Sequence, residues 1–252
     1  MVPTMAIAFL WGLLAASSLI VGGLIASWMT VGKRTLGLIM GFGAGVLFSA
    51  VAYELVYGAL HLAKMSGFPA FGFFAGALTF FFADMLIARM GGRGEGGAAS
   101  AAQSSLVVPL VLGIILDGIP ESVVIGLGVL QGGTVSVAML VAVFMSTLPE
   151  AGASTAGMRA GGWSRVRVFL LWSGIALVCG VASGAGYALL GDASDFVLAF
   201  VQAFAGGAIL MMLANTMIPE AYERAGKLAG VATVFGFATA VVVVVLEHTG
   251  AG

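Results

Sequence analysis

The sequence predicts an all-α membrane protein, a single transmembrane domain over residues 1–252 with eight membrane-spanning helices. Only 8% of the 252 residues are charged, 61% are hydrophobic and the mean hydropathy is +1.14, whereas a soluble domain carries roughly 25% charged residues. The chain also contains 39 glycines, which are costly inside soluble helices but let membrane helices approach closely. Most of the outer surface is therefore expected to face the lipid bilayer.

Eight stretches of sequence have the length that a spanning helix requires, about 20 mostly apolar residues. They are approximately residues 4–29, 35–60, 68–88, 105–130, 134–158, 166–190, 196–219 and 228–248. Short joints with turn residues separate them, and the Gly/Ala/Ser-rich joint 91–105 is the longest. No basic segment or visible cleavage site accompanies the first stretch, so we interpret it as a retained span rather than a signal peptide.

The basic residues predict how the spans are oriented. Nine of the ten Lys and Arg residues fall in the joints after spans one, three, five and seven, and only Lys64 falls in an alternate joint. Because Lys and Arg concentrate in cytoplasmic loops, both termini are predicted to be extracytoplasmic. We expect an integral protein of a bacterial inner (plasma) membrane. The formal net charge of −1 gives no indication of nucleic-acid binding.

A short internal similarity suggests a repeat. Residues 42–47 in the second span read FGAGVL, and residues 204–209 in the seventh read FAGGAI. Spans one to three and six to eight are then related units that flank spans four and five, in a 3+2+3 arrangement. Because each unit has an odd number of spans, the units have opposite topologies and form inverted repeats, as in many transporters.

An apolar-Pro-Glu tripeptide recurs inside the hydrophobic spans. Three of the six prolines are followed directly by Glu, although the chain has only seven Glu. These pairs are Pro120-Glu121, Pro149-Glu150 and Pro219-Glu220. Proline disrupts the helical hydrogen bond to the carbonyl four residues back, so each predicted kink offers a backbone oxygen near a carboxylate, and both are hard ligands for a cation.

Such polar groups are tolerated at membrane depth where they line a polar cavity. The alternative is that the prolines are packing kinks and the glutamates lie near the membrane interface. This alternative stays open above all for Glu220, which is followed by Glu223 and Arg224. Glu54 in the second span is a candidate for the ion pathway, as is Glu220, but Glu54 is equally compatible with an interfacial position.

Polar residues one turn before two of the glutamates complete a candidate cation site. Asp117 precedes Glu121 by four residues, so the two carboxylates share one helix face and their repulsion calls for a cation or protons to neutralise it. Ser146 has the same spacing to Glu150, and Thr147 follows it. The sequence therefore predicts an oxygen-lined cation site between spans four and five, formed by Asp117, Glu121, Ser146, Thr147 and Glu150.

Softer donors are left out of this predicted site. Cys179 is the single cysteine, which excludes an internal disulfide framework and a Cys-rich metal site, and we interpret it as a small buried side chain. The 13 methionines are interpreted as lipid-facing or core residues. His61 and His248 lie at the outer ends of spans without a second His or Cys at ligand spacing, so they indicate no zinc site.

The eight spans, the outward termini and the two Pro-Glu helices resemble the ZIP (Zrt/Irt-like) family of divalent metal transporters. In that family the fourth and fifth helices carry His-Asn-x-Pro-Glu-Gly-like and His/Gln-x-x-Pro-Glu-Gly-like motifs that form a metal site. In this chain residues 117–122 read DGIPES and residues 146–151 read STLPEA. The resemblance implies that Glu121 and Glu150 are metal ligands, that Asp117 is a substituted ligand, and that Ser146 and Thr147 are weak ones.

The departures from the family motif leave oxygen donors only. Asp117 replaces the usual His, Gly118 the Asn, and Ser146 the His or Gln. Oxygen donors favour harder ions such as Mn²⁺ or Fe²⁺ over zinc. We therefore predict a transporter, not an enzyme, that moves a transition-metal cation of the Zn, Mn or Fe class toward the cytoplasm, with the metal as substrate and no cofactor. A homodimer is the candidate assembly.

Two other functions stay open at this point. One is an intramembrane metal-dependent enzyme that uses Asp117 and Glu121 around a metal, although the chain lacks the paired catalytic motifs of such enzymes. The other is a non-transporting membrane scaffold or sensor with a ZIP-like fold.

Overall fold

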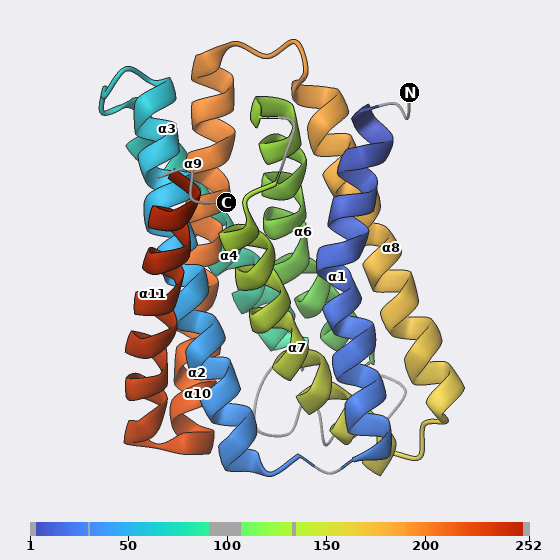
Figure 1. Cartoon of the computed structure of the whole chain (residues 1–252). Coiled ribbons are helices and arrows are strands. Elements are labelled where there is room, and N and C mark those ends of the chain that lie inside the picture. The colour runs from blue at the N-terminus through green and yellow to red at the C-terminus, as the bar shows by residue number, and fades with distance from the viewer. Residues whose placement is uncertain (1–3, 30, 91–106, 133–134, 249–252) are drawn as a thin grey trace.

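The apolar runs form helices because a helix bonds all of its backbone groups internally, which a bilayer core without water requires. In the computed structural model, which describes residues 4–29, 31–90, 107–132 and 135–248, no strand occurs. Eight helices in this part of the chain are long and apolar enough to cross a membrane. They run side by side as one bundle (Figure 1), which confirms the predicted all-α membrane class.

The described helices lie close to the predicted spans. They are α1 (Thr4–Trp28), α2 (Lys33–Ala50) with η1 (Val51–Val56) and α3 (Tyr57–Leu62), α4 (Phe68–Arg89), α6 (Val107–Gly132), α7 (Val137–Ala160), α8 (Arg165–Leu190), α9 (Asp195–Met212) with η2 (Leu213–Met217) and α10 (Ile218–Ala225), and α11 (Lys227–His248). The segments η1 and η2 are π-helical turns inside the second and seventh spans. The predicted joint 91–105 lies outside the described residues, as do the first residues of the predicted spans 105–130 and 134–158.

The seventh span is longer than the sequence predicts. Pro219 was expected to introduce a kink near the end of a span over 196–219, but α10 continues to Ala225 and ends where Gly226 adopts a φ of +61°. Pro219 lies in the first turn of α10, directly after η2. The π-helical turn directly before Pro219 already departs from regular α-helical bonding, and the span is one continuous helix over Asp195–Ala225. The chain can therefore pass through Pro219 and remain helical.

The packing of the helices places α6 and α7 in the interior of the bundle. Helix α7 packs between α1 and α2, and α6 packs against α8 and also contacts α1, α4 and α9. Helix α2 packs against α11, and α4 packs against α9. These contacts leave α4 and α11 largely on the outside (Figure 1). The spans that contain α2 and α9 are the most buried, and α6 and α7 are about half buried.

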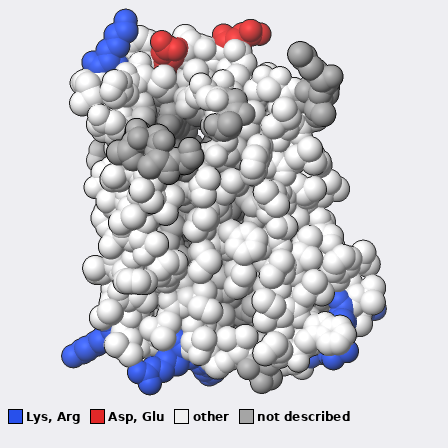
Figure 2. Space-filling model, viewed as in Figure 1, with Lys and Arg blue, Asp and Glu red and all other residues white. Residues whose placement is uncertain are grey.

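Charged residues mark the two ends of the bundle. Figure 2 shows an uncharged band between an end where Lys and Arg gather and an end where both acidic and basic side chains occur. The first residues of α1 and the last of α11 lie at the latter end (Figure 1). The basic residues Lys33, Arg34, Arg89, Arg159, Arg165, Arg167, Arg224 and Lys227 all lie at or near helix ends on the other side, while Arg93 lies outside the described residues.

We predict that the basic end faces the cytoplasm, which labelling of introduced cysteines can test. Asp192→Cys lies at the end that carries the termini, whereas Arg34→Cys and Lys227→Cys lie at the basic end, and all three positions are exposed. Because Lys and Arg are retained on the cytoplasmic side, a membrane-impermeant maleimide applied to intact cells should label only Asp192→Cys. Unmodified protein, whose Cys179 is buried, serves as the unlabelled control. Labelling of only Arg34→Cys and Lys227→Cys would show that the protein has the opposite orientation.

Candidate functional site

The candidate site lies between α6 and α7, where two small cavities share a set of carboxylates. Asp117, Glu121 and Glu150 line both of them, together with Thr147. The α8-side cavity is also lined by Ile114, Ser122 and Cys179 and by small residues of α1. The α9-side cavity is also lined by Met40, Ser146, Met212, Thr216, Met217 and Glu220. Each has a volume of about 20 Å³, and a single water needs roughly 10–15 Å³ on this measure.

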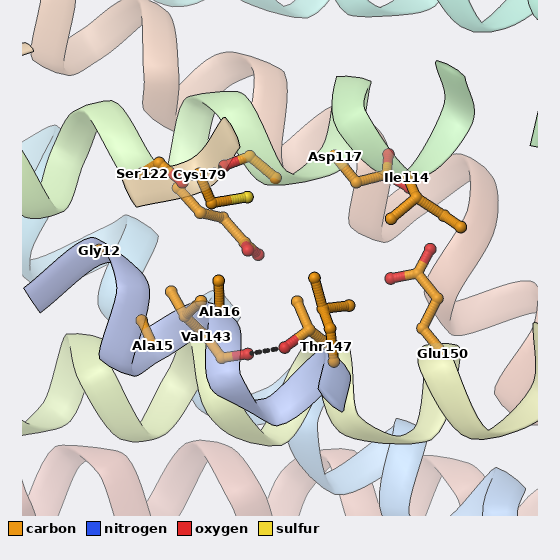
Figure 3. A pocket seen from close by; sticks show the side chains of 13 residues that line it. Gly12, Ala15, Ala16, Ile114, Asp117, Ser122, Val143, Thr147, Glu150 and Cys179 are labelled. Atoms are coloured by element: carbon orange, nitrogen blue, oxygen red, sulfur yellow. Dashed lines mark hydrogen bonds between the residues drawn. The ribbon is translucent and has the colours of Figure 1, made fainter. Parts of the chain in front are cut away.

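The helical spacing produces this arrangement. Asp117 and Glu121 lie one turn apart on α6, and both are buried. Thr147 and Glu150 lie one turn apart on α7, which faces α6 (Figure 3). In Figure 3 the carboxylates of Asp117 and Glu150 point into the space between these helices. The structure therefore brings together the five residues that the sequence predicts for the metal site.

Pro120 and Pro149 lie inside helices that continue through them. The predicted loss of one backbone hydrogen bond at each proline does not end α6 or α7. Both helices therefore carry a carboxylate directly after an internal proline while remaining long enough to span a membrane.

Hydroxyl groups form the polar wall on α7. Thr147 Oγ1 donates to the Val143 carbonyl at 2.8 Å (Figure 3) and pairs with the hydroxyl of Ser18 on α1. Ser146 Oγ lies 2.9 Å from the Val143 carbonyl and 3.4 Å from Glu121 Oε1. A serine has one hydroxyl proton, and the shorter distance shows that Ser146 donates it mainly to the Val143 carbonyl. The hydrogen bond from Ser146 to the Glu121 carboxylate is therefore weak.

Glu121 is a buried carboxyl group with an oxygen atom that is unsatisfied in the described structure. Its side chain is 2% exposed, and among the described residues its Oε2 atom has no hydrogen-bond partner. A buried polar atom without a partner costs about 1–3 kcal/mol, and more when the group is charged. The oxygen therefore provides a strong local driving force for binding a cation or another hydrogen-bonding species in the adjoining cavities.

The carboxylates do not already form a compact ligand cluster. Within the described ranges, no three His, Cys, Asp or Glu side chains lie close enough together to hold a metal ion. Asp117, Glu121 and Glu150 line common cavities, so a small movement of these side chains toward an ion is required for joint coordination. Hydroxyl and backbone oxygens of the same cavities are further donors that a hard cation can use.

Glu220 lies at the opening of this region toward the basic end. It lines the α9-side cavity, yet its Oε1 accepts hydrogen bonds from Arg224 Nε at 3.1 Å and from Nη2 at 2.5 Å. About a third of the Glu220 side chain is exposed. The sequence left Glu220 as either a pathway residue or an interfacial residue. Its position has features of both, because it is paired with Arg224 near the end of the bundle and also lines the cavity.

Glu54 is not brought to these cavities. It lies in η1, where its Oε1 accepts a hydrogen bond of 2.8 Å from Ser136, the N-cap residue of α7. The Glu54 carbonyl accepts one of 2.8 Å from Gln202 Nε2, and Gln131 Nε2 lies 3.4 Å from Gln202 Oε1. We refer to Glu54, Gln131, Ser136 and Gln202 as the Glu54 network. It ties η1 to α6, α7 and α9 toward the end that carries the termini.

Sequence reasoning missed several residues that line the cavities. Cys179 is buried, as expected, but it lines the α8-side cavity instead of only filling the core. Met40, Met212 and Met217 line the α9-side cavity, although they were grouped with lipid-facing or core methionines. The sequence could have indicated Ser122, because it directly follows Glu121 in the motif. Nothing in the sequence indicated that Cys179 and the three methionines line the cavities.

Neither a scan against protein-family models nor a search of curated proteins finds a match for the chain. The functional assignment therefore depends on the chemistry of the cavities.

Replacing Glu121 by an apolar residue of similar size should stabilise the protein in the absence of metal. Glu121→Met removes a buried oxygen without a partner, and such replacements are often neutral or stabilising. We expect a gain of about 1 kcal/mol, measured by thermal unfolding of the chelator-treated protein in detergent. Ser183→Ala is the control, because it removes a satisfied buried bond from Ser183 Oγ to the Ala8 carbonyl and should destabilise. A loss of stability in Glu121→Met equal to that in the control would show that the carboxyl is satisfied.

Proposed function

We propose that the chain is a ZIP-like divalent metal ion transporter that moves a transition-metal cation of the Zn, Mn or Fe class toward the cytoplasm. The observation that carries this proposal is the buried carboxylate pair of α6, Asp117 and Glu121, beside cavities of ionic size within a bundle of spanning helices. Two adjacent buried carboxylates repel each other unless cations or protons offset their charge. A divalent cation supplies the matching charge.

The size of the cavities favours an ion without its hydration shell. About 20 Å³ accommodates roughly one water molecule, so protein oxygens must replace the waters that the ion sheds. The carboxylates of Asp117, Glu121 and Glu150 are suited to this role, with Ser146 and Thr147 as weaker donors. These residues belong to the two ZIP-like motifs of the sequence.

The position of Glu220 supports a path toward the basic end. Glu220 lines the α9-side cavity and also pairs with the partly exposed Arg224. An ion that leaves Glu121 and Glu150 by this side meets a further carboxylate before it reaches the membrane interface. Because this end carries most of the Lys and Arg residues, the proposed direction of transport is inward.

Features of the second and seventh spans support inverted repeats in a 3+2+3 arrangement. The π-helical turns begin at Val51 and Leu213, each nine residues after the Phe of the similar hexapeptides. A Cβ added at Gly45 would overlap the Thr233 carbonyl on α11, and one at the matching Gly207 would overlap the Phe73 carbonyl on α4. Two related units of this kind permit alternating access about a fixed site, and π-turns are frequent at functional sites.

Removing the charge of either glutamate should abolish most metal binding and uptake. Glu121→Gln and Glu150→Gln keep the side-chain size, but each loses a charged partner of the ion, which we expect to cost about 2 kcal/mol or more, over tenfold in affinity. Uptake of Zn²⁺, Mn²⁺ and Fe²⁺ into liposomes that contain the purified protein is the measurement. Thermal unfolding with and without metal provides a second readout, because a ligand that binds the folded state raises its stability.

Glu223→Gln is the matched control, since Glu223 lies on α10 next to the site but is exposed. It should transport as the unmodified protein does. Glu220→Gln should lose less than Glu121→Gln, because its carboxylate is already paired with Arg224. If Glu121→Gln and Glu150→Gln take up metal at unmodified rates, the Pro-Glu pairs are structural and the proposed carboxylate site fails. If the unmodified protein takes up none of these ions, the transporter proposal fails.

A further inference from the structure

The α8-side cavity contains a sulfur donor beside the carboxylates. Cys179 on α8 is 4% exposed and lines this cavity with Asp117, Glu121 and Glu150. Figure 3 shows its sulfur pointing into the space next to Ser122, on the side of the cavity formed by α6. A cysteine that only filled the core would be expected to direct its sulfur toward apolar side chains, whereas this one is directed toward a polar cavity.

Gly118 provides the room that this sulfur occupies. A Cβ atom added at Gly118 would lie 3.0 Å from Cys179 Sγ, which is a tighter approach than ordinary carbon–sulfur packing. Gly118 precedes Glu121 by three residues and therefore lies on the same side of α6. The absence of a side chain at position 118 lets the sulfur lie against the helix face that carries Glu121.

An independent observation in the same cavity indicates a ligand. Glu121 Oε2 is buried and has no hydrogen-bond partner among the described residues, and Glu121 lines the cavity that Cys179 lines. Two potential metal ligands, the Glu121 carboxylate oxygen and the Cys179 sulfur, thus border a volume of about 20 Å³. That space holds about one water-sized particle, so an ion within it would be within reach of both after small side-chain movements.

We propose that Cys179 is a ligand of the transported ion, and that it shifts the preference of the site from hard Mn²⁺ toward borderline and soft cations such as Zn²⁺ and Cd²⁺. This inference rests on the proposed transport function. Thiolates select softer ions, whereas carboxylate and carbonyl oxygens alone suit Mg²⁺, Ca²⁺ and Mn²⁺. The oxygen-only donor set expected from the motifs is therefore incomplete.

Binding through Cys179 is a proton exchange without redox chemistry. The thiolate is the metal ligand, so the S–H bond breaks as the S–metal bond forms and one proton leaves the site. The proton passes to water or to a buffer base. The cation gains a thiolate ligand and keeps its oxidation state.

The α9-side cavity supports the same preference. Met40, Met212 and Met217 line it together with the shared carboxylates, and thioethers are soft donors that add no charge. Both cavities that Glu121 and Glu150 line are thus also lined by a sulfur-containing side chain.

Cd²⁺ binding to the purified full-length chain tests the proposal directly. A thiolate bound to Cd²⁺ gives an ultraviolet charge-transfer absorption, and because Cys179 is the single cysteine, any such band reports this residue. We expect a band that saturates at one Cd²⁺ per chain. Cys179→Ser should lack it and bind Cd²⁺ about tenfold or more weakly, while its affinity for Mn²⁺ stays within about twofold because Mn²⁺ uses the oxygen donors.

A relocated cysteine provides the matched control. Ala176 lies one turn before Cys179 on α8, is equally buried, and does not line the cavity. The double variant Ala176→Cys/Cys179→Ser should therefore show no band. A band of equal strength in this variant would overturn the proposal, because a thiol anywhere in the helix would then suffice.

Two further outcomes separate this inference from the transport proposal. If the unmodified protein binds Cd²⁺ without the band and Cys179→Ser binds it equally well, Cys179 is not a ligand, although the carboxylate site stands. If neither protein binds Cd²⁺, Zn²⁺ or Mn²⁺, the proposed transport function fails, and this inference fails with it.

Discussion

The carboxylates of α6 are placed where a membrane protein least tolerates charge, and the surroundings of the site depend on this placement. Asp117 and Glu121 are 3% and 2% exposed in a chain with 8% charged residues. The polar groups of neighbouring helices gather at the same level, with Ser146 and Thr147 on α7 and Ser18 on α1. Even so, one oxygen of Glu121 is left without a partner in the described structure. A site that leaves such an oxygen unsatisfied gains most from binding a cation.

Small residues make this site both possible and narrow. Gly12, Ala15 and Ala16 of α1 line the α8-side cavity, and a Cβ at Gly43 of α2 would lie 2.6 Å from the Met145 carbonyl on α7. Close helix approach of this kind replaces the hydrophobic driving force that lipid cannot provide. The same approach reduces the open space to about the volume of one water molecule. For the proposed transporter, selectivity would come from the donor atoms that touch a dehydrated ion, because a hydrated ion does not fit a space of this size.

Sequence patterns predicted the spans and the carboxylates better than the partners of those carboxylates. Helix length and apolar content are local properties, so the eight spans could be predicted from composition alone. The spacing between Asp117 and Glu121 is also local and placed both on one face of α6. Which residues of α8 and α9 face that side depends on helix rotation, and a helix that is apolar all round leaves rotation undetermined by hydrophobic periodicity. For this reason Cys179 and Met212 could not be assigned to the cavities.

Glu54 illustrates the same limit at a different depth. Its charge and its position in a span made it a pathway candidate, but the structure pairs it with Ser136 at the start of α7 and its carbonyl with Gln202 of α9.

The Glu54 network and the Glu220–Arg224 pair lie on opposite sides of the central carboxylates. A hydrogen bond to a charged group contributes about 1.5–3 kcal/mol and a partly exposed ion pair about 0.2–1 kcal/mol, so both connections can break and reform in the proposed transporter. The π-turn that carries Glu54 already departs from regular helical bonding, which makes it a natural place for such a change. In the proposed transporter, an ion held by Glu121 and Glu150 would contact α6 and α7, the two helices that the Glu54 network ties to η1.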